Sequence, residues 1–354
     1  MKRIVLATGG TGGHVFPAQS VGAALMQRGD QVFYITDHRG SRFFHEEDQP
    51  LHIMHIRRMG GILGTIRFTY TLGHEIWVCY WILRSVKPHL VMGFGSYASV
   101  APIVAAQILK IPTILHEQNA VLGRANRYLA KFANRVACSF EKTAVASTGN
   151  VIWTGNPLRS SFFHSAPYES LPKSPFTIVV IGGSQGSRIF SQVIPKAVMQ
   201  LSEEQQSNLI IHQHVRPEDA DNVKKIYEEF KGQIIIKDFF HNISELYNQA
   251  HVIIARSGAS TVSELCIMGR PSILVPYGAS LEGDQLYNAS YLADRQACIM
   301  MREYDFTARN LKKVLEDLLD NPSLRNKLAT NIRHLAVPDA IRRLLFEMDE
   351  QSRS

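Results

Sequence analysis

Short apolar runs rich in β-branched residues alternate with stretches of helical periodicity along the whole chain. The runs in the first half cover residues 4–7, 32–36, 52–56, 90–93, 113–116, 135–139 and 151–154. After a proline-rich break at 165–175, further runs follow at 177–181, 209–212, 234–237, 252–255, 272–275 and 297–301. Strands and helices that alternate in this way form parallel sheets, and strands without polar alternation fit sheets covered on both faces. The pattern predicts an α/β fold with two doubly wound sheets.

Two domains are expected because the chain has 354 residues, more than one hydrophobic core usually organises. Each half opens with a strand that runs into a glycine turn: IVLATGGTGG at 4–13 and IVVIGGSQG at 178–186. Apolar residues at helical spacing near the C-terminus predict a last helix that returns to the first domain. We therefore predict a first domain of residues 1–157 plus about 337–354, and a second domain of residues 158–336.

Both glycine turns suit a phosphate ligand. Backbone N–H groups of such a turn can approach phosphate oxygens at the positive end of the next helix. Ligands of doubly wound sheets bind outside the carboxyl ends of the strands, so two facing sheets define a cleft. A dinucleotide site is the main alternative, because Gly10, Gly12 and Asp37 partly match its fingerprint. It is disfavoured because Phe16 and Pro17 stand near the third glycine position, and because it leaves the second turn unexplained.

Composition excludes several classes of protein. With 45% apolar and 19% charged residues, the chain has the composition of a globular protein and not of a disordered or collagen-like one. No apolar run approaches the roughly 18–20 residues that cross a bilayer, and the N-terminal run is too short for a signal peptide, so we expect a cytoplasmic protein. The cysteines stand far apart, without a C-x-x-C pair, which predicts reduced, buried thiols and neither a zinc site nor disulfides. They are Cys79, Cys138, Cys266 and Cys298.

The positive charge of the chain lies in its first half. Residues 1–157 hold 16 Lys and Arg against 8 Asp and Glu, a surplus of +8, whereas the rest holds 22 against 23, or −1. Such a field favours an acidic partner: nucleic acid, anionic lipid or a polyphosphate substrate. Nucleic acid is the weakest of the three, because the chain has no recognisable nucleic-acid motif and no dense basic stripe.

Residues 60–87 combine apolar and aromatic residues with flanking cations, which is typical of a membrane-surface patch. The apolar and aromatic members are Ile62, Leu63, Ile66, Phe68, Leu72, Trp77 and Trp81, and the cations are Arg57, Arg58, Arg67, Arg84 and Lys87. The alternative is that Ile76, Tyr80 and Leu83 form the buried stripe of a helix packed on a sheet. We expect both, with core contacts on one helix face and lipid contact near a loop at 60–68.

Eight motifs, in order along nearly the whole chain, carry a resemblance to a known family. They are GGTGGH (9–14), GFGSY (93–97), HEQNAVLGRANR (116–127), TGNPLR (154–159), GGSQGSR (182–188), ARSGASTVSEL (255–265), RPSILVP (270–276) and DQLYNA (284–289). Together they closely resemble the MurG family of peptidoglycan glycosyltransferases, which move N-acetylglucosamine (GlcNAc) from UDP-GlcNAc to lipid I and form lipid II. The resemblance implies a GT-B architecture of two Rossmann-like domains, with the lipid-linked acceptor on the first and the donor on the second. It also implies a peripheral enzyme on the cytoplasmic face of the bacterial inner membrane, in contact with anionic lipid and other cell-wall synthesis proteins.

The reaction that the resemblance implies is inverting transfer to the 4-hydroxyl of MurNAc. The enzyme must seat a diphosphate, position the hydroxyl and remove its proton, without a covalent intermediate. His14 follows the first glycine turn at a predicted helix start, where the helix dipole disfavours the imidazolium, so we predict that it is the general base. The alternative is that His14 only hydrogen-bonds an acceptor phosphate or a loop carbonyl. Glu117 is the reserve base.

The resemblance also implies two groups of binding residues. On the acceptor side these are Thr11, Gly12, Gly13, Gly95, Ser96, Asn119 and Asn126. On the donor side, Arg159, Gly183, Ser184 and Gln185 would bind the diphosphate, and Phe240 would contact the uracil. Glu264, after the turn at Gly258, would bind the ribose, and Asp284, Gln285 and Asn288 would bind the sugar. Two residues depart from the family pattern: Ser96 replaces a usual glycine, and Asp284 replaces a usual Gln or His.

No metal or other cofactor is predicted. The D-x-D sequence at Asp219 and Asp221 falls in a polar helix start, where acidic residues are favoured without any metal. Two other functions remain open. A UDP-sugar epimerase, or a transferase with a soluble acceptor, would not need the basic, apolar patch. A catalytically silent nucleotide-sugar or glycolipid binder would not need both His14 and Glu264.

Overall fold

The computed structural model describes residues 1–44, 50–55, 61–144, 149–183, 186–280 and 283–353. The chain forms two compact units, Met1–Arg159 with Val337–Ser354, and Ser160–Ala336. The division falls two residues after the predicted boundary at 157, and the C-terminal residues belong to the first unit. With these bounds the first unit holds 20 Lys and Arg against 12 Asp and Glu, and the second holds 18 against 19.

The first unit is built on a seven-stranded parallel sheet in the order β3-β2-β1-β4-β5-β6-β7. Its strands are β1 (Arg3–Ala7), β2 (Gln31–Asp37), β3 (Leu51–Met54), β4 (Leu90–Gly93), β5 (Thr113–Glu117), β6 (Arg135–Cys138) and β7 (Val151–Trp153). All seven predicted strands are present, and the doubly wound sheet is confirmed. The strand order reverses between the neighbours β1 and β4, which makes the carboxyl ends of these two strands the expected ligand position.

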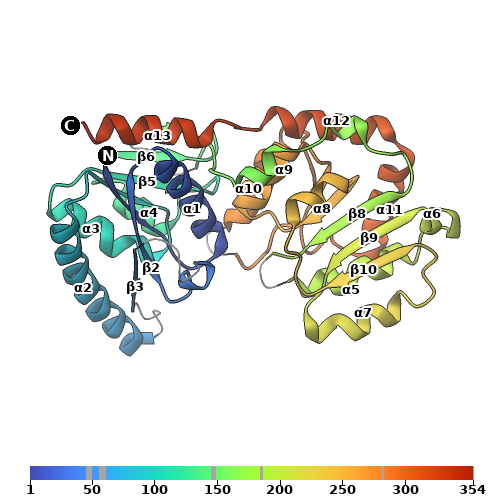
Figure 1. The fold of residues 1–354 in the computed structure, drawn as a ribbon. Coiled ribbons are helices and arrows are strands. Elements are labelled where there is room, and N and C mark those ends of the chain that lie inside the picture. Colours follow the sequence, from blue (N-terminus) through green and yellow to red (C-terminus); the bar gives the residue numbers. More distant parts are fainter. Residues whose placement is uncertain (45–49, 56–60, 145–148, 184–185, 281–282, 354) are drawn as a thin grey trace. The chain divides into compact units, whose positions relative to one another are not determined.

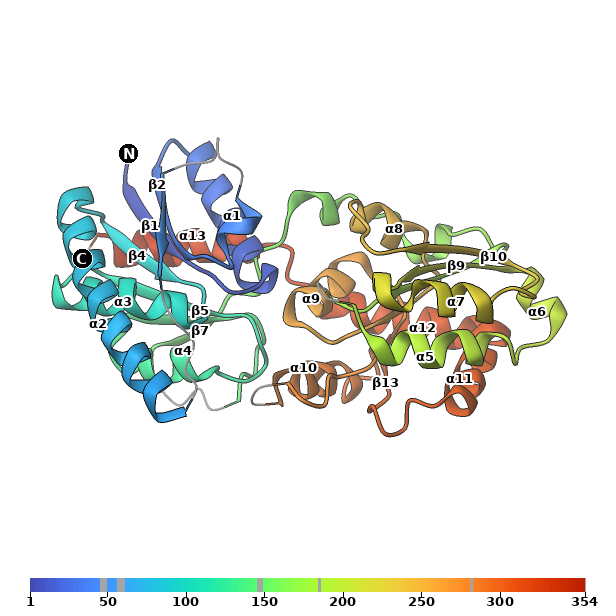
Figure 2. The ribbon, with the colours of Figure 1, turned by 90° about the horizontal axis from the view of Figure 1, so that it is seen from below.

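Helices cover both faces of this first sheet (Figure 1, Figure 2). They are α1 (Gly12–Gln27), α2 (Gly61–Val86), α3 (Val100–Ile108), α4 (Arg124–Leu129) and α13 (Ala340–Gln351), with short 3-10 helices at Ser41–Phe43 and Tyr97–Ser99. Leu344 and Met348 of α13 are buried in the same core cluster as Val21 and Leu25 of α1. The C-terminal helix therefore returns to the first unit, as predicted.

Helix α2 corrects the expected loop at 60–68, because the helix already begins at Gly61. Gly64 and Gly73 cost about 1 kcal/mol each in the helix interior, but no proline interrupts the segment. The predicted buried stripe is confirmed: Cys79 and Leu83 are fully buried, and Ile76 and Tyr80 pack beside them. The side chains of Ile62, Leu63 and Ile66, and all of Arg57 and Arg58, lie outside the described part.

The second unit holds a six-stranded parallel sheet in the order β10-β9-β8-β11-β12-β13. Its strands are β8 (Phe176–Ile181), β9 (Leu209–His214), β10 (Gln233–Lys237), β11 (Val252–Ala255), β12 (Ser272–Leu274) and β13 (Ile299–Met300). Its helices are α5 (Arg188–Val198), α6 (Glu203–Ser207), α7 (Ala220–Ile226), α8 (Ile243–Gln249), α9 (Ala259–Met268), α10 (Asp284–Ala293), α11 (Ala308–Asp320) and α12 (Pro322–His334), with 3-10 turns at Ser160–Phe163, Tyr168–Ser170 and Pro217–Asp219. The order reverses between β8 and β11, so the second glycine turn also lies at a switch point.

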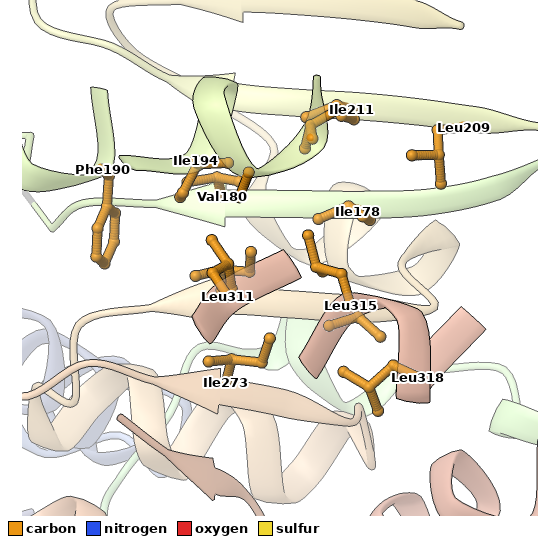
Figure 3. Close-up of a cluster of buried hydrophobic side chains, with 14 of the residues drawn as sticks. Ile178, Val180, Phe190, Ile194, Leu209, Ile211, Ile273, Leu311, Leu315 and Leu318 are labelled. Carbon is orange, nitrogen blue, oxygen red and sulfur yellow. The ribbon is translucent and has the colours of Figure 1, made fainter. Parts of the chain in front are cut away.

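The core of the second unit joins the sheet to α5 and α11 (Figure 3). Ile178 and Val180 of β8 point toward Leu311 and Leu315 of α11 between Ile211 and Ile273. All of these side chains are almost completely buried. This packing fixes β8, and therefore the position at which the second glycine turn leaves the sheet.

Two further expectations can be compared with the fold. All four cysteines are buried free thiols, as predicted. Among the helices of the described residues, none is both long enough and apolar enough to span a bilayer.

Candidate active site

The first glycine turn connects β1 to α1 and is held by Asp37 at the end of β2. The Asp37 carboxylate accepts the N–H groups of Gly10, at 2.9 Å, and Gly40, at 2.8 Å. A Cβ atom at Gly9 would lie 2.5 Å from Ala98 Cβ and 2.7 Å from Asp37 Oδ1, so only glycine fits there. Asp37 thus organises the turn, which accounts for the partial dinucleotide fingerprint without a nucleotide ribose.

His14 lies in the first turn of α1, partly exposed. Its Nδ1 is 3.4 Å from Thr11 Oγ1, and its ring faces Gly95, where a Cβ would come within 3.2 Å of His14 Cδ2. Desolvation lowers the pKa of His14 to about 4; among nearby charges, Asp37 raises it and Arg39 lowers it. The imidazole is therefore neutral at pH 7, as predicted. The largest cause is desolvation, and the contribution of the helix dipole stays a prediction.

Glu117 ends β5 in the centre of the HEQN motif and is buried. Its Oε1 accepts the backbone N–H and the side-chain amide of Asn119, at 3.0 and 3.2 Å. Its Oε2 accepts the N–H of Gly123, at 3.0 Å, and Nδ2 of Asn126, at 2.9 Å. Burial raises the pKa of Glu117, and these hydrogen bonds oppose the rise. A carboxylate offers about four acceptor positions, and Glu117 uses four here. Its geometry therefore fits a role in ordering the loop better than the role of reserve base that we predicted.

His116, which the sequence reasoning did not single out, ties the same loop to the end of the first domain. Its ring is fully buried, with Nδ1 3.0 Å from Gln118 Nε2 and Nε2 3.1 Å from the Gly155 carbonyl oxygen. Burial lowers the pKa of His116 to about 4, so the ring is neutral. A Cβ at Gly155, whose φ is +82°, would lie 2.6 Å from Val337. Asn126, in turn, donates to the His116 carbonyl at 3.1 Å.

Ser96 has a backbone conformation that is almost restricted to glycine. Its φ is 64° and its ψ is 162°, a combination that costs a non-glycine residue on the order of 1–3 kcal/mol. Its Oγ lies 3.1 Å from the position of a Cβ on Gly10, so the hydroxyl is beside the first glycine turn. The serine thus keeps the backbone shape that the usual glycine allows, and places a polar group next to the predicted acceptor residues.

Arg159 belongs to the first unit, although we predicted it in the second. Its guanidinium lies 4.7 Å from the ring centroid of Phe16, which is on α1 two residues after His14. The side chain is exposed. Its cation is thus beside the first glycine turn within its own unit.

The second glycine turn connects β8 to α5, and Ser184 and Gln185 within it lie outside the described residues. Gly183 and Gly186 have φ of +82° and +70°. A Cβ at Gly186 would lie 2.5 Å from Arg216 Cγ, so the Arg216 side chain packs against the turn. Arg216 donates to Asp219 at 2.9 Å.

Ser187 is the N-cap residue of α5, directly after this turn. Its Oγ is buried and, within the described part of the chain, has no hydrogen-bond partner. A buried hydroxyl at a helix N-terminus after a glycine turn is suited to an oxyanion. Neither Ser187 nor Arg216 was predicted. Ser187 belongs to the quoted GGSQGSR motif, whereas the role of Arg216 depends on a contact across 30 positions of sequence.

The remaining predicted donor residues lie around α9, α10 and the end of β10. Glu264 of α9 is mostly buried, between the buried Val262 and Leu265 as predicted, and Gly258 is the N-cap residue of this helix. Phe240 is partly buried after the edge strand β10, with its ring 6.2 Å from that of His212. The structure thus places Glu264 at the switch point and Phe240 at the edge of the same sheet.

Helix α10 is fixed to the loop after β11 by its predicted sugar-binding residues. Asn288 is fully buried and donates to the Ser257 carbonyl at 3.0 Å. Ser257 Oγ donates to the Gln285 carbonyl at 2.7 Å, and Gln285 Oε1 accepts the Tyr277 N–H at 3.0 Å. Asp284 Oδ1 accepts the N–H of Gln285 at 2.9 Å. The buried amide of Asn288 thus anchors α10 in this structure, whereas the amide nitrogen of Gln285 has no hydrogen-bond partner within the described ranges.

The D-x-D sequence begins α7, as predicted, with Asp219 paired to Arg216 and Asp221 fully exposed. Arg216 also brings it closer to the second glycine turn than we expected. Within the described ranges, no three His, Cys, Asp or Glu side chains gather in a way that could hold a metal ion.

Comparison with known proteins assigns both halves of the chain. Residues 4–138 match the glycosyltransferase family 28 N-terminal domain, and residues 177–344 match the C-terminal domain of the same family. A protein of Paramagnetospirillum magneticum is 39% identical over 347 residues, which cover 95% of this chain and 93% of the relative. One of Allorhizobium ampelinum is 36% identical, over 95% and 92%. Both are named UDP-N-acetylglucosamine--N-acetylmuramyl-(pentapeptide) pyrophosphoryl-undecaprenol N-acetylglucosamine transferase.

Solved structures agree with this assignment. The crystal structure of MurG from Acinetobacter baumannii has a TM-score of 0.84 and 26% identity, and covers 99% of this chain and 100% of that one. A UDP-GlcNAc 2-epimerase from Neisseria meningitidis shares the fold, with a TM-score of 0.69 at 15% identity over 99% and 100%. The predicted GT-B class is confirmed. The chain therefore belongs to glycosyltransferase family 28 and, within it, to the MurG family of N-acetylglucosamine transferases.

Proposed function

We propose that this chain transfers GlcNAc from UDP-GlcNAc to the 4-hydroxyl of MurNAc in lipid I, with inversion, and so forms lipid II. The observation that carries the proposal is the similarity to the named transferases over 95% of the chain. The site residues add to it. A neutral histidine lies beside the first glycine turn, which fits a ligand that loses a proton. After the second turn, a helix begins with a hydroxyl that has no partner among the described residues, which fits a ligand that carries phosphate.

On the acceptor side, His14 would act as the general base. The 4-hydroxyl oxygen attacks the anomeric carbon, the bond from that carbon to the phosphate oxygen breaks, and UDP leaves with the electron pair while His14 takes the proton. An N–H at Nδ1 would donate to Thr11 Oγ1, 3.4 Å away, and leave Nε2 as the acceptor. A pKa of about 4 makes a weak base, but a diphosphate bound at the turn would raise it. The alternative, in which His14 only binds the acceptor phosphate, predicts a change in acceptor affinity with little change in kcat.

On the donor side, the N-terminus of α5 would hold the diphosphate. Gly183 and Ser187 lie at this end, and the resemblance adds Ser184 and Gln185 as diphosphate ligands. It also assigns Arg159 to the diphosphate, where a guanidinium can neutralise the departing phosphate. Glu264 would accept hydrogen bonds from the ribose hydroxyls, the Phe240 backbone would face the uracil, and Gln285 would contact the sugar. This arrangement neutralises the leaving group with amides and a cation, so we propose that no metal is required.

We propose further that the first unit lies on the cytoplasmic surface of an anionic membrane. This unit carries eight more basic than acidic residues, and each such charge contributes about 1 kcal/mol near an anionic surface. On α2, Trp77 and Trp81 are 62% and 51% exposed, with their rings 6.4 Å apart. Arg84 lies over the Trp81 ring at 5.9 Å. Exposed tryptophans beside cations are suited to the headgroup boundary.

The membrane proposal can be tested by sedimentation with vesicles of an anionic phospholipid. Trp77→Ser with Trp81→Ser should reduce binding severalfold, and high salt should weaken it further. Phe346→Ser, which removes a similarly exposed aromatic from α13, is the matched control and should bind like the unmodified protein. Equal binding by all three proteins would contradict a role for α2.

An acceptor-dependence assay tests the proposed transfer. UDP release from UDP-GlcNAc should require lipid I and should match the lipid II formed, mole for mole. Acceptor-independent formation of UDP-N-acetylmannosamine would identify an epimerase instead, and binding of UDP-GlcNAc without turnover under any condition would identify a silent binding protein.

A further inference from the structure

Glu303 lies after β13, outside every motif of the chain, yet it makes two strong contacts. Its Oε1 is 2.6 Å from Arg256 Nη2, in an ion pair whose arginine side chain is only 10% exposed. Its Oε2 accepts the N–H of Gly278 at 3.0 Å. A Cβ at Gly278 would lie 2.7 Å from that oxygen, so the backbone approaches the carboxylate as closely as glycine allows. Glu303 thus joins the loop after β12 to the residue that follows β11.

Arg256 holds the other side of the same loop. Its Nη1 donates to the Val275 carbonyl at 3.1 Å. Its guanidinium lies between two rings, 5.1 Å from the centroid of Phe190 and 5.2 Å from that of Tyr277. Planar stacking and a fixed fork of donors make arginine specific for such a position. Together, Arg256 and Glu303 fix the backbone from Val275 to Gly278.

The backbone N–H of Tyr277, within this segment, fixes the orientation of the Gln285 side-chain amide. The Tyr277 N–H can only donate, so the side-chain atom of Gln285 at 3.0 Å must be the carbonyl oxygen. The amide NH₂ has no hydrogen-bond partner among the described residues, so it can donate to a ligand. Ser257 holds the Gln285 carbonyl at 2.7 Å, which fixes the start of α10 as well. Gln285 is consequently an oriented hydrogen-bond donor.

We propose that Glu303 is a positioning residue for the donor sugar. Through Arg256 and Gly278 it holds Tyr277 so that Gln285 presents its NH₂ group to an oxygen of the sugar. The inference rests on the proposed function, in which Gln285 contacts GlcNAc. It also makes a separate prediction: substitution of Glu303 should change the affinity for UDP-GlcNAc but not for UDP, because UDP lacks the sugar.

Calorimetry with UDP and with UDP-GlcNAc, in the absence of acceptor, tests this prediction. Glu303→Ala should weaken UDP-GlcNAc binding about tenfold and leave UDP binding within about twofold. Glu303→Gln, which keeps an acceptor for Gly278 but loses the ion pair, should give an intermediate loss in a chain of nearly unchanged shape. Glu316→Ala removes a carboxylate of similar exposure from an ion pair of the same length, with Lys312 on α11, and should change neither affinity.

A double-mutant cycle separates positioning from a general effect on folding. On a Gln285→Ala background, Glu303→Ala should cause no further loss of UDP-GlcNAc affinity. Equal losses for UDP and UDP-GlcNAc, additive losses in the cycle, or no loss at all would overturn the proposal. If the unmodified protein prefers another UDP-sugar, the proposed function fails, whereas a selective effect of Glu303 on that sugar would still uphold its positioning role.

Discussion

The two glycine turns share a backbone design but carry different chemistry. Each follows the strand at the switch point of its sheet and leads into a helix. At the first turn, the carboxylates of Asp37 and Glu117 accept backbone N–H groups of the surrounding loops, and a neutral histidine remains beside them. At the second turn, the helix N-terminus carries the unpaired hydroxyl of Ser187 in the part of the chain that the structure describes. The same fold thus supports a proton acceptor in one unit and an anion site in the other.

The net charge of each unit does not follow the chemistry at its glycine turn. The unit with Asp37 and Glu117 carries the basic surplus, and the unit with the expected diphosphate site is nearly neutral. In the proposed function, the long-range charge of the first unit would act on the membrane and the acceptor, whereas local dipoles and single side chains would hold the donor.

The largest expected effect concerns the proton acceptor. His14→Ala should lower turnover by roughly a hundredfold or more, because general-base catalysis contributes about two to four decades. UDP affinity should stay the same, since we propose that UDP binds to the other unit. His38→Ala, an exposed histidine that follows β2, is the control and should retain full turnover. Near-normal turnover of His14→Ala would exclude the base role.

The second largest effect is expected at the proposed ribose ligand. Glu264→Ala should weaken UDP and UDP-GlcNAc binding alike, by about 1–3 kcal/mol, because hydrogen bonds to a charged group are lost. Calorimetry provides the measurement, and Glu229→Ala, an exposed glutamate of the same unit, should bind like the unmodified protein. A folded Glu264→Ala protein with unchanged UDP affinity would remove the ribose role.

A smaller effect is expected at Ser96. Ser96→Gly should raise the free energy of unfolding by about 1 kcal/mol, because glycine adopts the observed backbone angles without strain. Ser96→Ala keeps the strain and should not stabilise the protein. Denaturant unfolding of both variants distinguishes backbone strain from loss of the hydroxyl. Equal stability of the two variants would show that the conformation is not strained.

The smallest effect is expected for the pH dependence of kcat/KM, which should stay flat near pH 6.5. The pKa of His14 is lowered to about 4, so its neutral form persists well below pH 6.5. The value of kcat/KM, which reports the free enzyme, should therefore show no acid limb near pH 6.5 that depends on His14.

The free energy of unfolding, measured by denaturant titration, should depend on pH in this range. The folded pKa values of His14 and His116 lie below the unfolded value, so the free energy of unfolding should fall between pH 6.5 and 4.

The sequence predicted those features that depend on local pattern. The strands were predictable because each is a continuous apolar run between helices, and the C-terminal return followed from apolar spacing alone. The start of α2 could not be predicted in the same way, because glycines at 61 and 64 suggest a loop when helix packing is unknown. Contacts between distant residues were also out of reach. Arg256 and Glu303 are 47 positions apart, and neither residue reveals the pair by its neighbours.

The stereochemistry of the product tests whether the sugar is transferred in one displacement, as we propose for a base at the first turn and a donor bound at the second. The new glycosidic bond, formed from α-linked UDP-GlcNAc and lipid I, can be assigned by the coupling of its anomeric proton in NMR. A β-linked product, with one UDP released per bond, is the predicted result. An α-linked product would contradict direct displacement with His14 as base.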